Sequence, residues 1–216
     1  MFAILRKQSL APLLLIVGAM AGAACGASAD EQQRLEQVYD ETGKLQLLKY
    51  DANDNGTVET WSYMDGARIV RIEIDGNEDG TIDRWEYYTA DQQIEKIGSS
   101  RGRDGKVDSW AYYAADGSIA RLELSTKRDD TVDRTEYYET GVLRRAEEDT
   151  DGDRRIDKWE TYDRGRLATV AFDTKRQGVP DRRLVYEAGG AVRLEVAPDG
   201  DGRFAPAPPT AAPSRP

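Results

Sequence analysis

Short runs of strictly alternating apolar and polar residues recur through the chain. Two clear examples are the segments Val70–Ile74 and Ala168–Phe172. Alternation with a period of two is typical of β-strands that have one face packed and the other in water. Glycine-containing segments, such as those at Gly66 and Gly141, separate these runs from others that are rich in aromatic and β-branched residues. The pattern therefore predicts β-hairpins.

The hairpin pattern repeats with a step of 24 or 25 residues. All four tryptophans occupy one slot of the repeat, which is filled in chain order by Trp61, Trp85, Trp110, Thr135, Trp159 and Arg183. Regular repeats indicate units that pack mainly against their neighbours. The predicted fold class is all-β, an antiparallel meander of tandem hairpin repeats of ~24 residues with about a dozen strands over residues 38–204. Open, coiled and closed arrangements of the sheet all remain compatible with it.

Side chains of the repeat suggest how neighbouring strands interact. We expect the Trp and Tyr rings to stack into ladders along the sheet. We also expect Arg and Glu to oppose each other on the wet face, as in Arg71 with Glu73 and Arg121 with Glu123. These contacts predict a scaffold held together along its length.

Two segments resemble a known kind of repeat. Tyr39-Asp40-Glu-Thr-Gly43-Lys-Leu45 and Tyr162-Asp163-Arg-Gly165-Arg-Leu167 are similar to the YD repeats of bacterial shell and adhesin-like proteins. The resemblance covers about residues 38–196. It implies the order of the strands and the placement of the turns, and it implies no particular function.

Residues 1–24 have the organisation of an export signal. Basic Arg6 and Lys7 precede an apolar run, and the small residues that follow end at Cys25. The segment Gly22-Ala23-Ala24-Cys25 resembles the lipobox of bacterial lipoproteins, which implies lipidation (palmitate among the acyl chains) of Cys25. In such lipoproteins, a residue other than Asp after the Cys implies the cell outer membrane, and here that residue is Gly26.

Other readings of the ends of the chain remain open. Cleavage after Ala29 would give a secreted or periplasmic soluble protein, and retention of the apolar run would give a membrane anchor. Residues 25–37 are predicted to be a polar tether, with a short helix over residues 30–38. Residues 205–216 are rich in Pro and Ala and are predicted to be a disordered tail.

Charge and composition exclude several functions. After residue 24 the chain holds 28 Lys and Arg against 40 Asp and Glu, so nucleic-acid phosphates would be repelled. The complete absence of His excludes Ser-His-Asp triads, Cys-His pairs and His-bound zinc. We therefore predict a non-enzymatic protein. A hydrolase of envelope glycans that uses carboxylates is the remaining enzymatic alternative.

Residues 75–86 match the calcium-loop spacing D-x-[DN]-x-[DN]-G-x5-E, although helical periodicity is missing on both sides. Calcium takes about six to eight oxygen ligands, which closely spaced carboxylates supply. A second loop, 149–160, has a similar pattern but carries Arg154 where Gly is expected. The predicted ligands are Asp75, Asn77, Asp79, Asp83 and Glu86 in the first loop and Asp149, Asp151, Asp153, Asp157 and Glu160 in the second.

The same loop residues have a purely structural interpretation. Asp, Asn and Gly also dominate turns, because their side chains bond the nearby backbone and tolerate positive φ. Three other loops carry bases, and if all loops lie along one edge those bases can neutralise acidic neighbours. The sequence thus predicts a lipid-anchored envelope scaffold that offers a surface to a protein or glycan partner and is stabilised by calcium. A calcium-responsive binding module is the alternative.

Overall fold

The computed structural model describes residues 34–197 and 202–207, and it confirms the predicted all-β meander of hairpins. The strands are β1 (Leu35–Tyr39), β2 (Leu45–Tyr50), β3 (Thr60–Asp65), β4 (Arg68–Ile74), β5 (Arg84–Tyr88), β6 (Ile94–Ser99), β7 (Ser109–Tyr113), β8 (Ile119–Leu124), β9 (Arg134–Glu139), β10 (Val142–Glu148), β11 (Lys158–Asp163), β12 (Arg166–Phe172), β13 (Arg182–Tyr186), β14 (Val192–Val196) and β15 (Ala205–Pro206).

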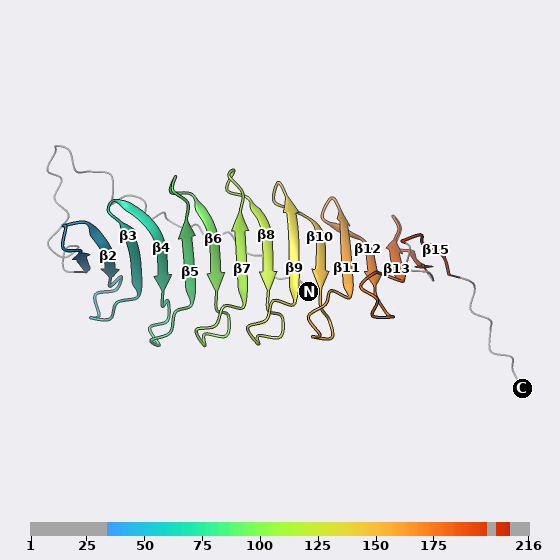
Figure 1. Ribbon diagram of the computed structural model, residues 1–216, viewed down its shortest axis with the longest axis horizontal. Coiled ribbons are helices and arrows are strands. Elements are labelled where there is room, and N and C mark those ends of the chain that lie inside the picture. Colours follow the sequence, from blue (N-terminus) through green and yellow to red (C-terminus); the bar gives the residue numbers. More distant parts are fainter. Residues whose placement is uncertain (1–33, 198–201, 208–216) are drawn as a thin grey trace, which may run out of the picture.

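All fifteen strands form one antiparallel sheet in the order in which they occur along the chain. Each strand pairs only with its sequence neighbours, so the sheet is open, with β1 and β15 at its two ends. Figure 1 shows that the described residues form a single layer, in which no helix from this part of the chain covers either face. Within the described ranges there is no helix long and apolar enough to cross a membrane.

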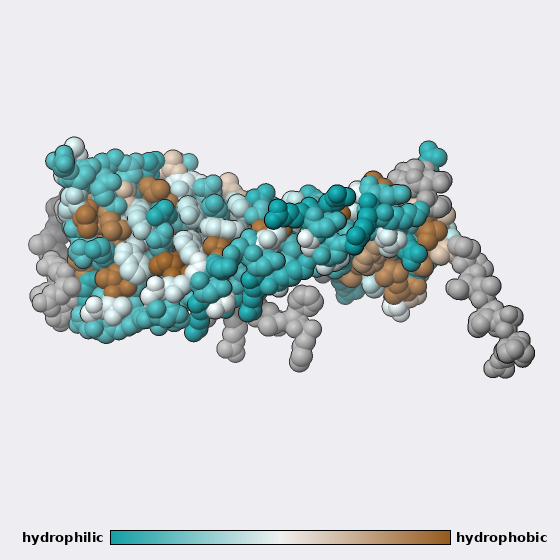
Figure 2. All heavy atoms as spheres, turned by 60° about the horizontal axis from the view of Figure 1, so that its bottom comes forward, coloured by the Kyte–Doolittle hydropathy of each residue, from teal (hydrophilic) through white to brown (hydrophobic). Residues whose placement is uncertain are grey.

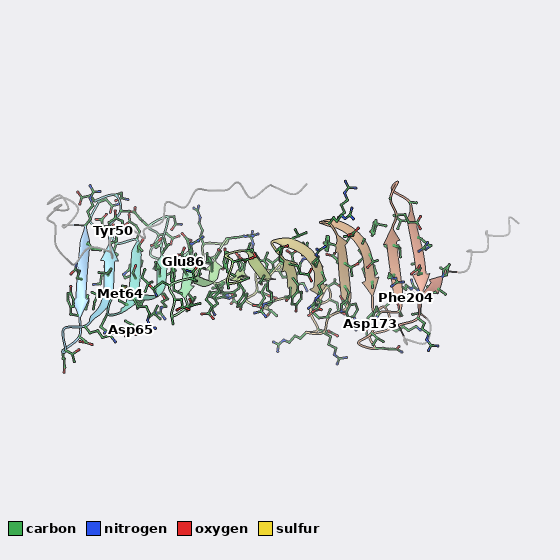
Figure 3. All side chains as sticks on the ribbon, turned by 90° about the horizontal axis from the view of Figure 1, so that it is seen from above. Tyr50, Met64, Asp65, Glu86, Asp173 and Phe204 are labelled. Carbon is green, nitrogen blue, oxygen red and sulfur yellow. The ribbon has the colours of Figure 1, made fainter. Side chains whose placement is uncertain are left out.

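The sheet twists strongly along its length. The central strands are seen at full length in Figure 1, whereas Figure 3, turned by 90°, shows the end strands at full length and the central ones foreshortened. This rotation follows the preferred twist between adjacent strands, which is about 20–25° per strand. The two faces of the sheet therefore turn progressively about its long axis.

The ends of the described chain differ from the sequence prediction. The expected helix over residues 30–38 is wrong for the part that is described, because Leu35 to Tyr39 form β1 and pair with β2. Ala205 and Pro206, expected in a disordered tail, pair with β14 as β15. Cys25, the export signal, residues 25–33 of the tether and residues 208–216 of the tail lie outside the described residues.

Register divides the strand residues between two faces. The middle row of one face consists of aliphatic residues interrupted by polar ones, and we call this face the apolar face. In strand order from β3 to β12, its middle row is Ser62, Ile72, Glu86, Ile97, Ala111, Leu122, Glu136, Ala146, Glu160 and Val170. Its buried residues include Met64, Ile72, Ile97, Ala146 and Val170. Figure 2 shows apolar residues interrupted by polar ones, so the surface in that view is not continuously hydrophobic.

The opposite face, which we call the aromatic face, alternates aromatic and charged residues. Its Tyr row, from β3 to β10, is Tyr63, Arg71, Tyr87, Lys96, Tyr112, Arg121, Tyr137 and Arg145. The guanidinium carbons lie 3.9, 4.0 and 3.4 Å from the ring centroids in the pairs Arg71–Tyr63, Arg121–Tyr112 and Arg145–Tyr137. Such cation–π contacts contribute about 0.5–1 kcal/mol each at exposed sites.

Aromatic ladders along neighbouring strands are not the main contact of this face. The aromatic slots fall on alternate strands, and strands two apart are separated by about 10 Å, so a charged side chain lies between most rings. Tyr87 and Trp110, with centroids 5.8 Å apart, are one ring pair that does meet. It does so where Gly98 faces Trp110, because Gly98 has no side chain to separate the rings.

Arg71 and Glu73 also pair along one strand, at 3.2 Å, rather than across two strands.

Candidate metal centre at the loop edge

Six long loops line one edge of the sheet, at the bottom of Figure 1. They join an even-numbered strand to the next odd-numbered one and span residues 51–59, 75–83, 100–108, 125–133, 149–157 and 173–181. The first residue of a loop donates its backbone N–H to the last residue of the loop before, as Asp75 does to the Glu59 carbonyl at 2.8 Å. The loops therefore lie along one edge of the sheet, and these backbone hydrogen bonds fix each loop against its neighbour.

Carboxylates at the first loop position mostly bind their own loop. Asp149 Oδ1 accepts the N–H of Gly152 at 2.6 Å, and its Oδ2 accepts that of Arg154 at 2.7 Å. Asp51 and Asp173 likewise accept backbone N–H groups on both oxygens. Burial acts to raise the pKa of all three, but these N–H groups stabilise the charged form and leave each pKa below its ordinary value. The structural interpretation of the loops therefore holds for these acids.

Carboxylates at the ninth loop position bind the residue in second place. In three loops that residue is a threonine, which offers both its N–H and its hydroxyl. Asp157, for example, accepts the Thr150 N–H on Oδ1 at 3.1 Å and the Thr150 hydroxyl on Oδ2 at 2.8 Å. Asp133 with Thr126 and Asp181 with Thr174 repeat this arrangement.

Loop 75–83 leaves a carboxylate oxygen without a partner at both positions. Asp75 is only 2% exposed; its Oδ2 accepts the Gly80 N–H at 2.8 Å, while its Oδ1 is buried with no hydrogen-bond partner. Asp83 Oδ2 accepts the Gly76 N–H at 3.2 Å, and its Oδ1 is also buried without a partner. The second residue here is Gly76, which has no hydroxyl for Asp83. Two carboxylate oxygens in this loop are therefore shielded from water and unsatisfied.

Asp149, Asp151 and Asp153 form a cluster that can hold a metal ion, because one oxygen from each lies within 4.8 Å of the others. Bases from both adjacent loops approach this cluster. Arg176 lies 2.7 Å from Asp151, and Lys127 favours the charged form of Asp149. The expectation that basic loops neutralise acidic neighbours is confirmed here.

The remaining predicted ligands have other partners. Asn77 donates its amide to Asp79 at 2.8 Å, a bond that lowers the pKa of Asp79, as does nearby Arg103 to a smaller extent. Glu86 lies in the middle of β5, where its two oxygens accept bonds from Arg84 and Tyr88, both at 2.6 Å. Figure 3 labels it on the strand. The structure therefore places the twelfth position of this motif on the sheet and not in the loop.

Glu160, the last predicted ligand of the second loop, also lies on a strand. It meets Arg134 at 2.7 Å, Lys158 at 2.8 Å and the Tyr162 hydroxyl at 2.7 Å. Although burial acts to raise the pKa of Glu160, these partners lower it to about 2. Burial and the hydrogen bond to Glu160 raise the pKa of Tyr162 to about 12.

Sequence reasoning missed two features of this edge. The first is the role of the second loop residue, since a Thr in that place satisfies the ninth-position Asp and a Gly does not. The signal was visible as Asp-Thr or Ser-Thr at the start of three loops. The second is Arg134, which ties Glu136, Glu148 and Glu160 together from three strands.

No protein-family model matches this sequence, and a search of curated proteins finds no relative either. The functional argument therefore depends on the residues alone.

Proposed function

We propose that this protein is a non-enzymatic repeat scaffold of the cell envelope. Lipidated Cys25 holds it at a membrane, and its aromatic face binds a protein partner. The observation that carries the proposal is the Tyr row from Tyr63 to Arg145. Its side chains alternate tyrosine with Arg or Lys on a sheet face that no described segment covers, and most of them are half-buried rather than fully packed. Tyr, Trp and Arg are the residue types most enriched in the energetic centres of protein interfaces.

The surroundings of the carboxylates support a role without catalysis. A general acid requires a raised pKa, which comes from burial next to other acids. Here Asp51, Asp149, Asp173 and Glu160 have lowered pKa values, because N–H groups or bases stabilise their charged forms. These ionised carboxylates suit a role in stabilising the fold.

Site-specific photocrosslinking of the full-length protein in its own cells tests the surface. We expect a photoreactive residue at Tyr112 to form a discrete protein adduct that Arg121→Glu abolishes. The matched control is Ala111, the neighbouring residue on the apolar face, which should form none. No adduct from Tyr112, or equal adducts from both positions, would refute the aromatic face as the binding surface; a glycan adduct would change the partner class.

The anchor is tested separately. Cys25→Ser should move the protein from the membrane fraction to the soluble fraction, and the control Ser28→Ala should leave it with the membrane. If Cys25→Ser stays with the membrane, lipidation is not what holds the protein there.

A calcium-responsive module is the second candidate, favoured by the cluster of Asp149, Asp151 and Asp153. Closely spaced carboxylates repel one another, and a divalent cation removes this repulsion. A ligand that binds the folded state raises the melting temperature. Thermal unfolding with calcium and with chelator should therefore give different midpoints; equal midpoints would exclude an ion-dependent fold.

A further inference from the structure

We propose that the calcium site of this protein is built on the carboxylates of Asp75, which is buried, and of Asp83, whose Oδ1 is buried. This calcium site rests on the calcium-responsive form of the proposed function and gives that function its ligands. Binding of a partner at the aromatic face does not require the calcium site. Asp75 directly follows Ile74 and Asp83 directly precedes Arg84, the registered partner of Ile74, so both residues lie at the same end of the β4–β5 hairpin. Their carboxylates reach into the loop, as the bonds from Gly80 and Gly76 show.

Unsatisfied oxygens carry the argument. A buried carboxylate oxygen without a donor costs free energy, because it has lost water and gained nothing in return. Loop 75–83 holds two of them, Asp75 Oδ1 and Asp83 Oδ1. Both belong to acids, so the same cation would satisfy both oxygens and remove the repulsion between them.

The sister loops serve as internal comparisons. Where Asp is first and Thr is second, as in loops 149–157 and 173–181, backbone N–H groups and the Thr hydroxyl take up the carboxylate oxygens. Loop 100–108 leaves one oxygen buried and unpaired, that of Asp108, but has Ser100 in first place and Arg101 and Arg103 beside it. Only loop 75–83, among the loops that the structure describes, combines two unpaired acidic oxygens with a sequence free of bases.

The chemistry of the loop fits calcium better than magnesium. Calcium accepts a mixture of carboxylate, side-chain amide and backbone carbonyl oxygens in a flexible arrangement, whereas magnesium requires near-octahedral geometry and retains much of its water. Besides Asp75 and Asp83, loop 75–83 contains Asn77, Asp79 and the backbone carbonyls of its turn. The cluster of Asp149, Asp151 and Asp153 is the weaker competitor, since Arg176 and Lys127 already balance its charge.

Calorimetric titration of the full-length protein with calcium chloride, after chelator treatment, tests the assignment. We expect Asp83→Asn and Asp75→Asn to weaken calcium affinity at least tenfold. The matched controls are Asp151→Asn in the cluster and Asp108→Asn in the basic loop, which should leave it unchanged. We also expect calcium-free Asp83→Asn to melt above the calcium-free wild type, because one of two like charges with a shielded, unpaired oxygen is gone.

Gly76→Thr gives a test that keeps both acids. Gly76 is not in the left-handed backbone region, and an added Cβ would approach Asp83 Oδ2 no closer than 3.8 Å, so the substitution fits. Its hydroxyl would bond Asp83 as Thr150 bonds Asp157 and should lower calcium affinity at least tenfold. Unchanged affinity in both Gly76→Thr and Asp83→Asn would overturn the assignment. Loss of affinity in Asp151→Asn alone would move the ion to the cluster. No calcium heat in the wild type would remove the ion-responsive function as well, while the photocrosslinking result would stand independently.

Discussion

Arg134 Nη2 on β9 lies 2.7 Å from Glu160 Oε2 on β11, although a whole strand, β10, runs between them. The intervening strand contributes Glu148, whose carboxylate meets the same guanidinium at 2.9 Å. Arg134 thus joins three strands on the apolar face, with only 14% of its side chain exposed. In this part of the sheet, charge replaces the aliphatic residues that hold the strands together elsewhere.

Replacing Arg134 should therefore be strongly destabilising. Arg134→Met keeps most of the volume but leaves three glutamates without their shared partner, and breaking a buried ion pair from one side costs about 3–5 kcal/mol. The control is Arg144→Ala, which removes an exposed pair with Glu139 and should cost less than about 1 kcal/mol. Urea unfolding measures both. Similar values for the two variants would contradict the proposed role of Arg134.

Acid should weaken the same network. The pKa of Glu160 is about 2 in the folded protein and near 4.5 when unfolded, so the unfolded chain binds a proton first as pH falls. The stabilisation is complete above about pH 4.5 and is lost progressively toward about pH 2. Glu160→Gln should reduce the slope of unfolding free energy against pH in this window. Chemical denaturation at several pH values checks it, and parallel slopes for variant and wild type would contradict it.

Replacing Gly98 should destabilise the folded protein while Trp110 is present. A Cβ at Gly98 would lie 2.8 Å from Trp110 Cζ3, closer than van der Waals contact allows. Overpacking of this kind costs about 1–3 kcal/mol, so Gly98→Ala should lower stability by that amount. In a Trp110→Leu background the same change should be nearly neutral. A double-mutant cycle measures the difference, and an equal cost in both backgrounds would mean that the ring is not the obstacle.

Removing the bases beside the aspartate cluster should create a second ion site. Arg176 pairs with Asp151, and Lys127 balances Asp149. With both changed to Ala, the three carboxylates lose these two counter-charges, and we expect one additional calcium ion per chain by calorimetry. Lys106→Ala is the control, since it pairs with Asp130 in another loop. An unchanged stoichiometry in the double variant would show that the bases do not compete with metal.

Much of the architecture could be predicted from local patterns. The Trp slot, the alternating runs and the turn glycines specify hairpins in series, and two antiparallel strands per repeat place all long loops on one edge. The expected stacking of the Trp and Tyr rings into ladders was wrong, because equivalent slots fall on every second strand, about 10 Å apart, with a charged side chain between most rings. The bridge from Arg134 to Glu160 depends on the register of three strands at once.

The candidate metal site was predictable only in part. The spacing of Asp75, Asn77, Asp79 and Gly80 marked the loop, but a linear motif could not show that Glu86 would bind Arg84 and Tyr88 on the sheet. Nor could it show which carboxylate oxygens the backbone would satisfy. That depends on loop conformation, and in particular on whether the second residue offers a hydroxyl.

Because the strands lie in the sheet in the order of the chain, the number of repeats sets the length of the molecule. Each repeat contributes two strands and lengthens the sheet by about 10 Å. Duplicating or deleting one repeat unit therefore changes the reach of the protein in fixed steps, and no enclosed interior has to be rebuilt when it happens.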